Sequence, residues 1–251
     1  MKNLTIKNVT FNSGLPKICV SLCATNQQEL VKQAEKYCQR GGFDVLEWRL
    51  DYFSELSLPT LLAAAKQLRT LCQNYIILAT FRTKQEGGEQ TITLNDYFAL
   101  NYALIESNTI DMVDLELLLA PEKVAACIRY AHQVNVAVVV SNHDFVKTPS
   151  EAEIINRLCQ MQNMGADLAK IAVMPHTPQD VLCLLSATNK MVQHHATIPV
   201  ITMAMGKLGL ISRLSGEIFG SAMTFGCIDY ASAPGQIQLA ELRKILDILH
   251  S

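Results

Sequence analysis

The sequence predicts an α/β protein with the fold of a closed (β/α)8 barrel, or TIM barrel, and three observations favour it. The chain has 251 residues, close to the roughly 250 that such a barrel uses. Eight short apolar runs rich in β-branched residues recur along it. The segments between these runs carry residues with which helices begin. Strand and helix therefore alternate eight times, as in parallel βαβ units, and we expect one catalytic domain over residues 1–251.

Each apolar run has the length of a strand that is covered on both faces. In chain order the runs are residues 17–23, 43–50, 75–82, 112–118, 136–143, 168–174, 199–205 and 222–227. Before the first run, residues 4–6 and 9–11 flank a short polar turn. They predict a small β-hairpin that plugs one end of the barrel.

The expected helix starts combine a hydroxyl residue or a proline with the first-turn residues that capping favours. They lie at Thr25 with Gln28, at Thr148-Pro149 with Glu151, at Thr177-Pro178, and at Pro59 and Pro121. Gly41 and Gly42 are expected to end the first helix. An open doubly wound sheet is the alternative fold, but no Gly-x-Gly-x-x-Gly motif follows the first strand.

Composition narrows the class of protein. Hydrophobic residues make up 49% and charged residues 18%, which suits a continuous core. The formal net charge is -2 and there is no basic block, so we expect a small-molecule partner and neither a nucleic acid nor a membrane. The N-terminus lacks the apolar stretch of a signal peptide, which predicts a cytoplasmic location. The eight cysteines form no Cys-x-x-Cys pair, and we expect reduced core residues.

Lys170 places an ammonium group inside a strand that is otherwise apolar. Burying an unpaired charge is costly, so such a lysine must be paired with a carboxylate or lose its proton. The first possibility is a structural ion pair. The second is an amine nucleophile that attacks a ketone. The residues alone leave both open.

His143 ends the strand next to the one that carries Lys170, where a general base would be expected. A hydrogen-bonded packing role is the alternative, and His176, after the lysine strand, is a weaker candidate for the base. No histidine and carboxylate cluster has the spacing of metal ligands, so we predict no metal site.

Three arginines, Arg49, Arg82 and Arg213, follow strand ends, where a guanidinium can hold a carboxylate. Acidic residues at neighbouring strand ends are expected to balance these cations, namely Glu47, Glu86, Asp114 and Glu116. The loop at residues 229–236 is small, polar and punctuated by Gly and Pro, as expected of a mobile lid or of an ordinary loop.

Taken together, these motifs resemble the type I 3-dehydroquinate dehydratases over essentially the whole chain. The resemblance is carried by Glu47-Trp48-Arg49, Thr80-Phe81-Arg82, Glu86-Gly87-Gly88-Glu89, Ser141-Asn142-His143-Asp144-Phe145, Lys170-Ile171-Ala172, Ile201-Thr202-Met203, Arg213 and Ser232-Ala233-Pro234-Gly235-Gln236. Ala204 stands where many members of the family have serine.

The resemblance implies the shikimate-pathway dehydration of 3-dehydroquinate, without a cofactor, by a homodimer. It implies that Lys170 forms an imine with the substrate ketone, that His143 is the general acid and base, and that Glu86 positions His143. It further assigns substrate contacts to Ser21, Glu47, Arg49, Arg82, Met203, Arg213, Phe225, Ser232, Ala233 and Gln236.

Two other functions compete with this hypothesis. A class I aldolase or transaldolase also uses a lysine on the sixth strand, but it usually binds a sugar phosphate. Gly206-Lys207-Leu208-Gly209 is only a weak match to a phosphate loop. The second alternative is a catalytically silent barrel that binds a metabolite or a partner.

Overall fold

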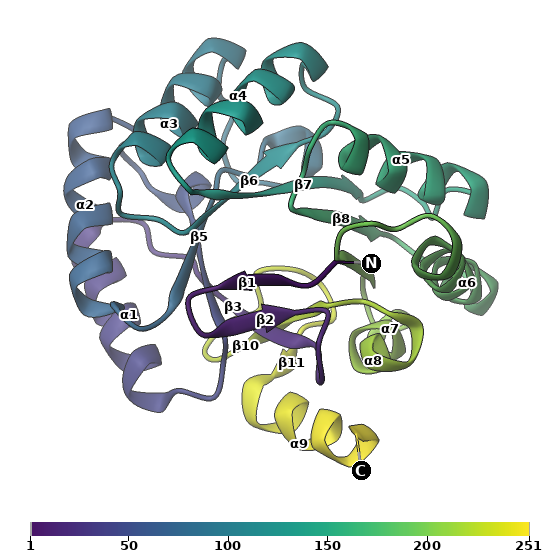
Figure 1. Ribbon diagram of the computed structural model, residues 1–251. Helices are drawn as coiled ribbons and strands as arrows, with labels where there is room; N and C mark the ends of the chain where they lie inside the picture. The colour runs from purple at the N-terminus through teal and green to yellow at the C-terminus, as the bar shows by residue number, and fades with distance from the viewer. Residues whose placement is uncertain (1, 251) are drawn as a thin grey trace.

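Eight parallel strands curl into a barrel in the computed structural model, which describes residues 2–250 (Figure 1). From β3 to β9 each strand pairs with the next along the chain, and β10, the last, pairs with β3, the first. They are β3 (Lys17–Leu22), β4 (Val45–Arg49), β5 (Ile76–Thr80), β6 (Met112–Glu116), β7 (Ala137–Asp144), β8 (Leu168–Val173), β9 (Val200–Ala204) and β10 (Met223–Cys227). The ring closes between β9 and β10, where the Ala222 N–H donates to the Val200 carbonyl at 2.8 Å. The predicted barrel is confirmed, and only β7 runs one residue past its predicted end.

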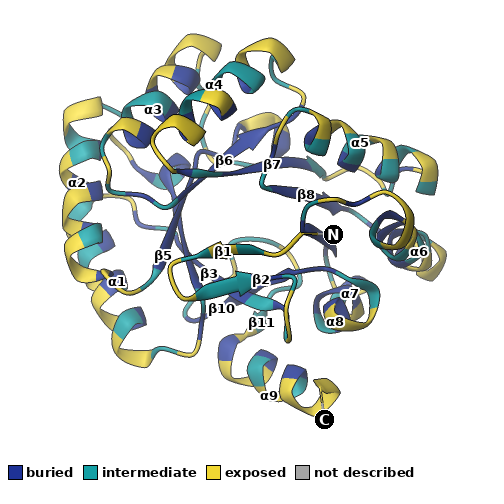
Figure 2. Ribbon diagram, viewed as in Figure 1, coloured by how far each residue is buried: buried dark blue, intermediate teal, exposed yellow. Residues whose placement is uncertain are grey.

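Helices ring the barrel and bury the faces that they turn toward it (Figure 2). The long ones are α1 (Gln27–Arg40), α2 (Leu58–Leu71), α3 (Leu94–Glu106), α4 (Pro121–Gln133), α5 (Glu151–Asn163), α6 (Pro178–His194) and α9 (Leu239–His250). Two short helices, α7 (Leu210–Leu214) and α8 (Gly216–Phe219), fill the place between β9 and β10. Shorter elements follow three of the strands, namely η1 (Leu50–Tyr52), η2 (Lys84–Glu86) and β11 (Ile237–Gln238).

Four of the predicted helix boundaries are confirmed. Thr177 caps α6 in a capping box with Asp180, and Gly41 ends α1 with a φ of 60°. Pro59 and Pro121 lie in the first turns of α2 and α4.

Two predicted caps are wrong. The N-cap of α1 is Asn26 rather than Thr25, because the Asn26 side chain accepts the Glu29 N–H at 3.0 Å. The Thr25 hydroxyl instead donates to the Glu29 carboxylate. The N-cap of α5 is Ser150 rather than Thr148, since the Ser150 hydroxyl accepts the Glu153 N–H.

The hairpin formed by β1 (Leu4–Ile6) and β2 (Val9–Phe11) is antiparallel, as predicted, and lies across the N-terminal end of the barrel (Figure 1). Its Phe11 is fully buried and packs with the apolar side chains inside the barrel, such as Val45, Leu78 and Leu168. A second and larger apolar core lies between the strands and the helices. With one end of the barrel filled by apolar side chains, the opposite end is left for polar ones.

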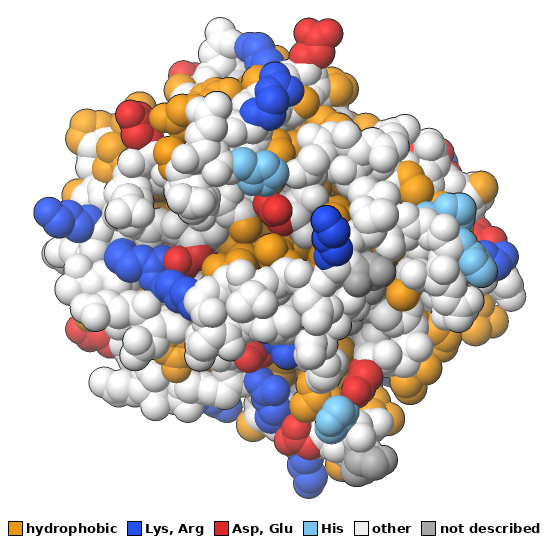
Figure 3. All heavy atoms as spheres, viewed as in Figure 1, with side chains coloured by type: hydrophobic (Ala, Val, Ile, Leu, Met, Phe, Trp, Pro, Cys, Tyr) orange, Lys and Arg blue, Asp and Glu red, His pale blue; other side chains and the backbone are white. Residues whose placement is uncertain are grey.

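On the face that carries the hairpin, positive and negative side chains are interspersed (Figure 3). Within residues 2–250, no helix combines the length and the apolar character needed to cross a membrane.

Candidate active site

A cavity opens at the C-terminal ends of the barrel strands, and it contains about 490 Å³ of space not filled by atoms. All the predicted catalytic and substrate-binding residues line it except Ser21. They are Glu47, Arg49, Arg82, Glu86, His143, Lys170, Met203, Arg213, Phe225, Ser232, Ala233 and Gln236. Ser21 lies beside Glu47, its partner in the pairing of β3 with β4. Its hydroxyl donates to Glu47 at 2.5 Å and accepts from Ser232 at 2.9 Å.

Lys170 points into the barrel because its neighbours Ala169 and Ile171 face the outer core. Its ammonium Nζ lies 3.5 Å from Asp114 Oδ2 and 4.0 Å from Glu47 Oε1. Both distances exceed those of an ordinary N–H···O hydrogen bond. The Nζ atom also lies 4.5 Å from the centre of the Phe225 ring. The lysine is therefore buried beside carboxylates, as the ion-pair interpretation requires, but it is held loosely and at the wall of a cavity.

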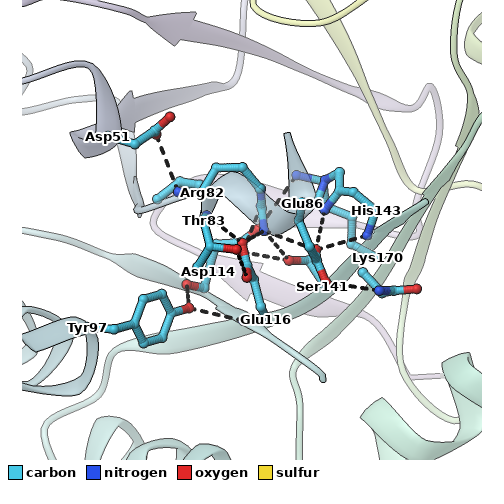
Figure 4. A network of polar contacts seen from close by, with 12 residues as sticks. Asp51, Arg82, Thr83, Glu86, Tyr97, Asp114, Glu116, Ser141, His143 and Lys170 are labelled. Carbon is cyan, nitrogen blue, oxygen red and sulfur yellow. Dashed lines mark hydrogen bonds and ion pairs between the residues drawn. The ribbon is translucent and has the colours of Figure 1, made fainter. Parts of the chain in front are cut away.

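His143 is fixed by Glu86, which η2 presents at the end of β5 (Figure 4). The ring atom Nδ1 lies 2.9 Å from Glu86 Oε2, and the His143 backbone N–H donates to the same oxygen at 2.9 Å. Burial, together with the positive charges of Arg82, Lys170 and Arg49, holds the pKa of His143 well below its usual value. Burial raises the pKa of Glu86, although Arg82 opposes this. At neutral pH the imidazole is therefore uncharged, which a general base requires.

Arg82 is the centre of a buried network of charges (Figure 4). Its guanidinium donates to Asp114 and to Glu116, each at 2.9 Å, and to the Ser141 hydroxyl at 3.0 Å. Although burial works against ionisation, Arg82 and Lys170 keep the pKa of Asp114 below its usual value. Arg82, which lines the cavity, therefore joins the buried carboxylates of Asp114 and Glu116.

Arg49 has a protein carboxylate of its own. It makes a two-pronged pair with Asp51, at 2.8 and 2.7 Å. Such a pair fixes the plane of the guanidinium.

Arg213 differs from Arg49 and Arg82, because no carboxylate among the described residues lies within ion-pair distance of it. Its guanidinium donates to the Pro234 carbonyl at 3.0 Å and contacts Met203 Sδ at 3.5 Å. Its Nε atom is buried without a hydrogen-bond partner. Burial lowers the pKa of Arg213 to about 10. A positive charge that is buried without a protein carboxylate is suited to bind an anion.

The loop at residues 229–236 lies against the cavity. Ser232 and Gln236 bond to each other twice, since the Ser232 N–H donates to Gln236 Oε1 and the Gln236 amide donates to Ser232 Oγ, both at 2.9 Å. The Pro234 carbonyl also accepts the Gly206 N–H at 3.1 Å. Few side chains of the loop are buried, and Tyr230 is 84% exposed.

The family of the chain follows from its similarity to known proteins. A sequence model described as type I 3-dehydroquinase matches residues 18–251. The chain belongs to the type I 3-dehydroquinase family. A relative from Salmonella enteritidis, a 3-dehydroquinate dehydratase, is 49% identical over 251 residues, which cover 100% of this chain and 99% of the relative. The predicted hydro-lyase of the shikimate pathway is thereby confirmed.

Solved structures of type I 3-dehydroquinases share the fold closely. The Clostridium difficile enzyme, solved with covalently modified comenic acid, is 43% identical with a TM-score of 0.96, over 99% of this chain and 98% of that one. The Enterococcus faecalis enzyme is 39% identical with a TM-score of 0.93, over 99% and 100%. A 3-keto-L-gulonate-6-phosphate decarboxylase from Vibrio cholerae matches at 17% identity and a TM-score of 0.60 over 93% and 98%, and this likeness shows the fold alone.

Four residues that were not predicted as site residues also line the dehydroquinase cavity. They are Gly87, Phe145, Ala172 and Met205. Phe145 packs so closely on Gly87 that a side chain at residue 87 would collide with the ring. Phe145 lies inside the motif that carries His143, which was the available signal.

His176, the weaker candidate for the base, is exposed and bonds to the Val146 carbonyl, outside the cavity. Among residues 2–250, no three His, Cys, Asp or Glu side chains are grouped as metal ligands would be.

Proposed function

We propose that this dehydroquinase converts 3-dehydroquinate to 3-dehydroshikimate through a Schiff base on Lys170, with His143 as the general acid and base. The observation that carries the proposal is the convergence on one cavity of a buried lysine, a histidine held by Glu86, and Arg213, whose Nε has no hydrogen-bond partner. Each answers one need of the reaction: a nucleophile, a proton carrier and a partner for the substrate carboxylate.

Arg213 would bind the carboxylate of the substrate, because it is the arginine of the cavity that lacks a protein carboxylate. Arg49 and Arg82 are already paired, so they would act through the charge network and through the ring hydroxyls together with Glu47 and Ser21. The substrate ring would pack against the apolar wall formed by Met203, Phe225 and Ala233, beneath Ser232 and Gln236.

The covalent step begins when the neutral amine of Lys170 attacks the ketone carbon. A C–N bond forms, and the ketone oxygen takes one proton from the attacking nitrogen and one from solvent and departs as water, which leaves a protonated imine. Asp114 and Glu47 lie 3.5 and 4.0 Å from Nζ, so their carboxylates can balance the positive charge of the protonated imine. A buried positive charge needs a counter-charge, and these carboxylates supply it without an added ion.

Elimination follows because the iminium withdraws electrons from the neighbouring C–H bond. His143 removes that proton, and the electron pair moves to form an enamine. The enamine then expels the hydroxyl, to which the His143 imidazolium returns its proton, so that water leaves. Hydrolysis of the remaining imine releases product and restores the Lys170 amine. One base thus serves both proton transfers.

The Clostridium difficile relative supports covalent chemistry in this family, since it was solved with a covalently modified acid. We also propose that the chain is a single catalytic domain that acts as a cytoplasmic homodimer. Sedimentation of the purified protein would test the dimer.

The proposed function is tested by following enone absorbance from 3-dehydroquinate, with borohydride added during turnover. We expect one reduced adduct, on the peptide that contains Lys170, and loss of both adduct and turnover in Lys170→Met. The matched control is Lys190→Met, because Lys190 pairs with Glu151 on the outer helices. An adduct on another lysine, or persistent turnover without Lys170, would overturn the proposal.

A further inference from the structure

A line of side-chain hydrogen bonds runs from helix α5 to the ring of His143. Glu153 holds Arg157 Nε at 2.7 Å, and Arg157 NH1 donates to Asn142 Oδ1 at 2.8 Å. Asn142 Nδ2 then donates to Glu86 Oε1 at 2.9 Å. Glu86 Oε2 in turn meets His143 Nδ1 at 2.9 Å. Neither Asn142 nor Arg157 has a part in the mechanism given above.

The chemistry of the donors fixes the direction of every bond in this line. A guanidinium carries only donors, so the Asn142 atom that faces Arg157 must be the amide oxygen. The amide NH2 group is thereby turned toward Glu86. Arg157 and Glu86 together fix the orientation of the Asn142 amide, which an isolated asparagine would leave free.

Three of the groups that face Glu86 can only donate. Its Oε1 faces the Asn142 NH2 group, and its Oε2 faces the backbone N–H of His143 and lies 3.6 Å from the Arg82 guanidinium. Burial raises the pKa of Glu86, but these three groups oppose that effect because they favour the ionised, acceptor-only form of the carboxylate. The carboxylate then requires a proton on His143 Nδ1, which leaves Nε2 as the unprotonated nitrogen of the ring. This is the tautomer in which Nε2 can act as a base.

We propose that Arg157 is a positioning residue that selects the Nδ1–H tautomer of His143 by orienting Asn142 against Glu86. The inference rests on the proposed role of His143 as general base. Arg157 reaches Glu86 only through Asn142. Its side chain is 17% exposed at the outer wall of the barrel mouth, whereas that of Glu86 is 8% exposed.

Without Arg157 the Asn142 amide is free to turn over and present its oxygen to Glu86. Two acceptors would then face each other, which favours a proton on Glu86. A protonated Glu86 would donate to Nδ1 and move the ring proton to Nε2. The imidazole would stay neutral but could no longer accept a proton at Nε2.

The sharpest test is Asn142→Asp, because it changes the donor that faces Glu86 into an acceptor with almost no change of shape. Arg157 would still hold one oxygen of the new carboxylate. We expect kcat to fall about 10- to 100-fold, part of the roughly 100- to 10,000-fold given by a general base, with KM within about twofold. In ligand-free protein, the ¹⁵N shifts of the His143 ring should change from the Nδ1–H pattern to the Nε2–H pattern.

Arg157→Met should have the same effect in a milder form, about 10-fold in kcat, and Arg157→Lys should recover part of it because an ammonium is also donor-only. The matched control is Arg129→Met on the exposed face of α4, which should change neither kcat nor the ring shifts.

The outcomes separate this inference from the proposed function. Wild-type ring shifts in both Asn142→Asp and Arg157→Met would overturn the positioning role, even if the rate fell. In that case borohydride trapping on Lys170 would still stand. A changed tautomer with an unchanged rate would instead remove His143 from the chemistry.

Discussion

The ring and the backbone of His143 both meet one oxygen of Glu86, Oε2, and each does so at 2.9 Å. Two contacts from one residue to one atom fix the imidazole in position as well as in orientation. The ring cannot turn without losing Nδ1, and β7 cannot shift without losing the backbone bond. The base must reach first a C–H bond and then a departing oxygen, and a fixed ring position favours both proton transfers.

Replacement of His143 by alanine should therefore lower kcat by more than the roughly 100- to 10,000-fold usually assigned to one general base, because both proton transfers lose their carrier. Imine formation with product should survive, since Lys170 is untouched. Single-turnover kinetics combined with borohydride trapping would measure the two effects separately.

The matched control for that experiment is His194→Ala at the end of α6, which should leave the rate unchanged. Turnover of His143→Ala near the wild-type rate would contradict the assignment. His176 could not readily take over the role, because it lies outside the cavity.

The pH dependence of kcat/KM should reveal His143 and Glu86 as a coupled pair. Burial raises the pKa of Glu86 to about 8 and lowers that of His143 well below its usual value, so the usual order of the two values is reversed. The charges facing the pair are Arg82, Glu116 and Asp114 around Glu86, and Arg82, Lys170 and Arg49 around His143. The active form is the deprotonated base, so activity should be lost as pH falls and the pair takes up its proton.

In Glu86→Gln only His143 can take up that proton, and its pKa should fall further without the neighbouring carboxylate. The acid limb of kcat/KM should therefore move to lower pH, while kcat is reduced at every pH. Glu106→Gln, at the exposed end of α3, is the control. An acid limb that stays in place or moves to higher pH would show that the pair does not govern it.

The sequence predicted the eight strands well, because each is a mainly apolar run that the burial on both faces explains. Most site residues were also predicted, since they follow strand ends and carry the family motifs. The caps at Asn26 and Ser150 were missed because several adjacent polar residues compete for the same position. The contact of Arg157 with Asn142 could not be predicted, since it depends on how α5 packs beside β7. That Arg213 lacks a carboxylate is likewise a property of the assembled barrel alone.

Dialysis against a strong chelator should leave the rate unchanged, because in the proposed mechanism the iminium supplies the electron sink that a metal would otherwise provide. Enone formation before and after dialysis would measure this. Loss of activity that one particular metal ion restores would contradict this prediction. The buried carboxylates of Glu47, Asp114 and Glu116 would then be the groups to examine as its ligands.

Binding of the substrate carboxylate and closure of the loop at residues 229–236 should depend on different residues. Arg213 carries a charge that should contact the substrate carboxylate throughout the reaction, so Arg213→Ala should mainly raise KM, by about 10-fold or more for a lost charge-assisted contact. Gln236 makes its two bonds within the loop, to Ser232. Gln236→Ala should therefore weaken closure of the loop over the imine, and so lower kcat as well as raise KM. Gln238→Ala, two residues along and exposed on β11, is the matched control.

Hydrogen exchange over residues 229–236 would decide whether this loop is a lid. Its polar contacts with the rest of the protein include Asp229 with Lys36, Ser232 with Ser21, and the Pro234 carbonyl with Arg213 and Gly206. A segment that buries so little should open readily when the cavity is empty, and a bound carboxylate at Arg213 should add polar partners for Ser232 and Gln236. We expect exchange of these amides to slow when product binds, and to slow less in Gln236→Ala than in the wild type. Equal exchange with and without product would show that closure plays no part, and the fall in kcat of Gln236→Ala would then have to come from direct contact with the substrate.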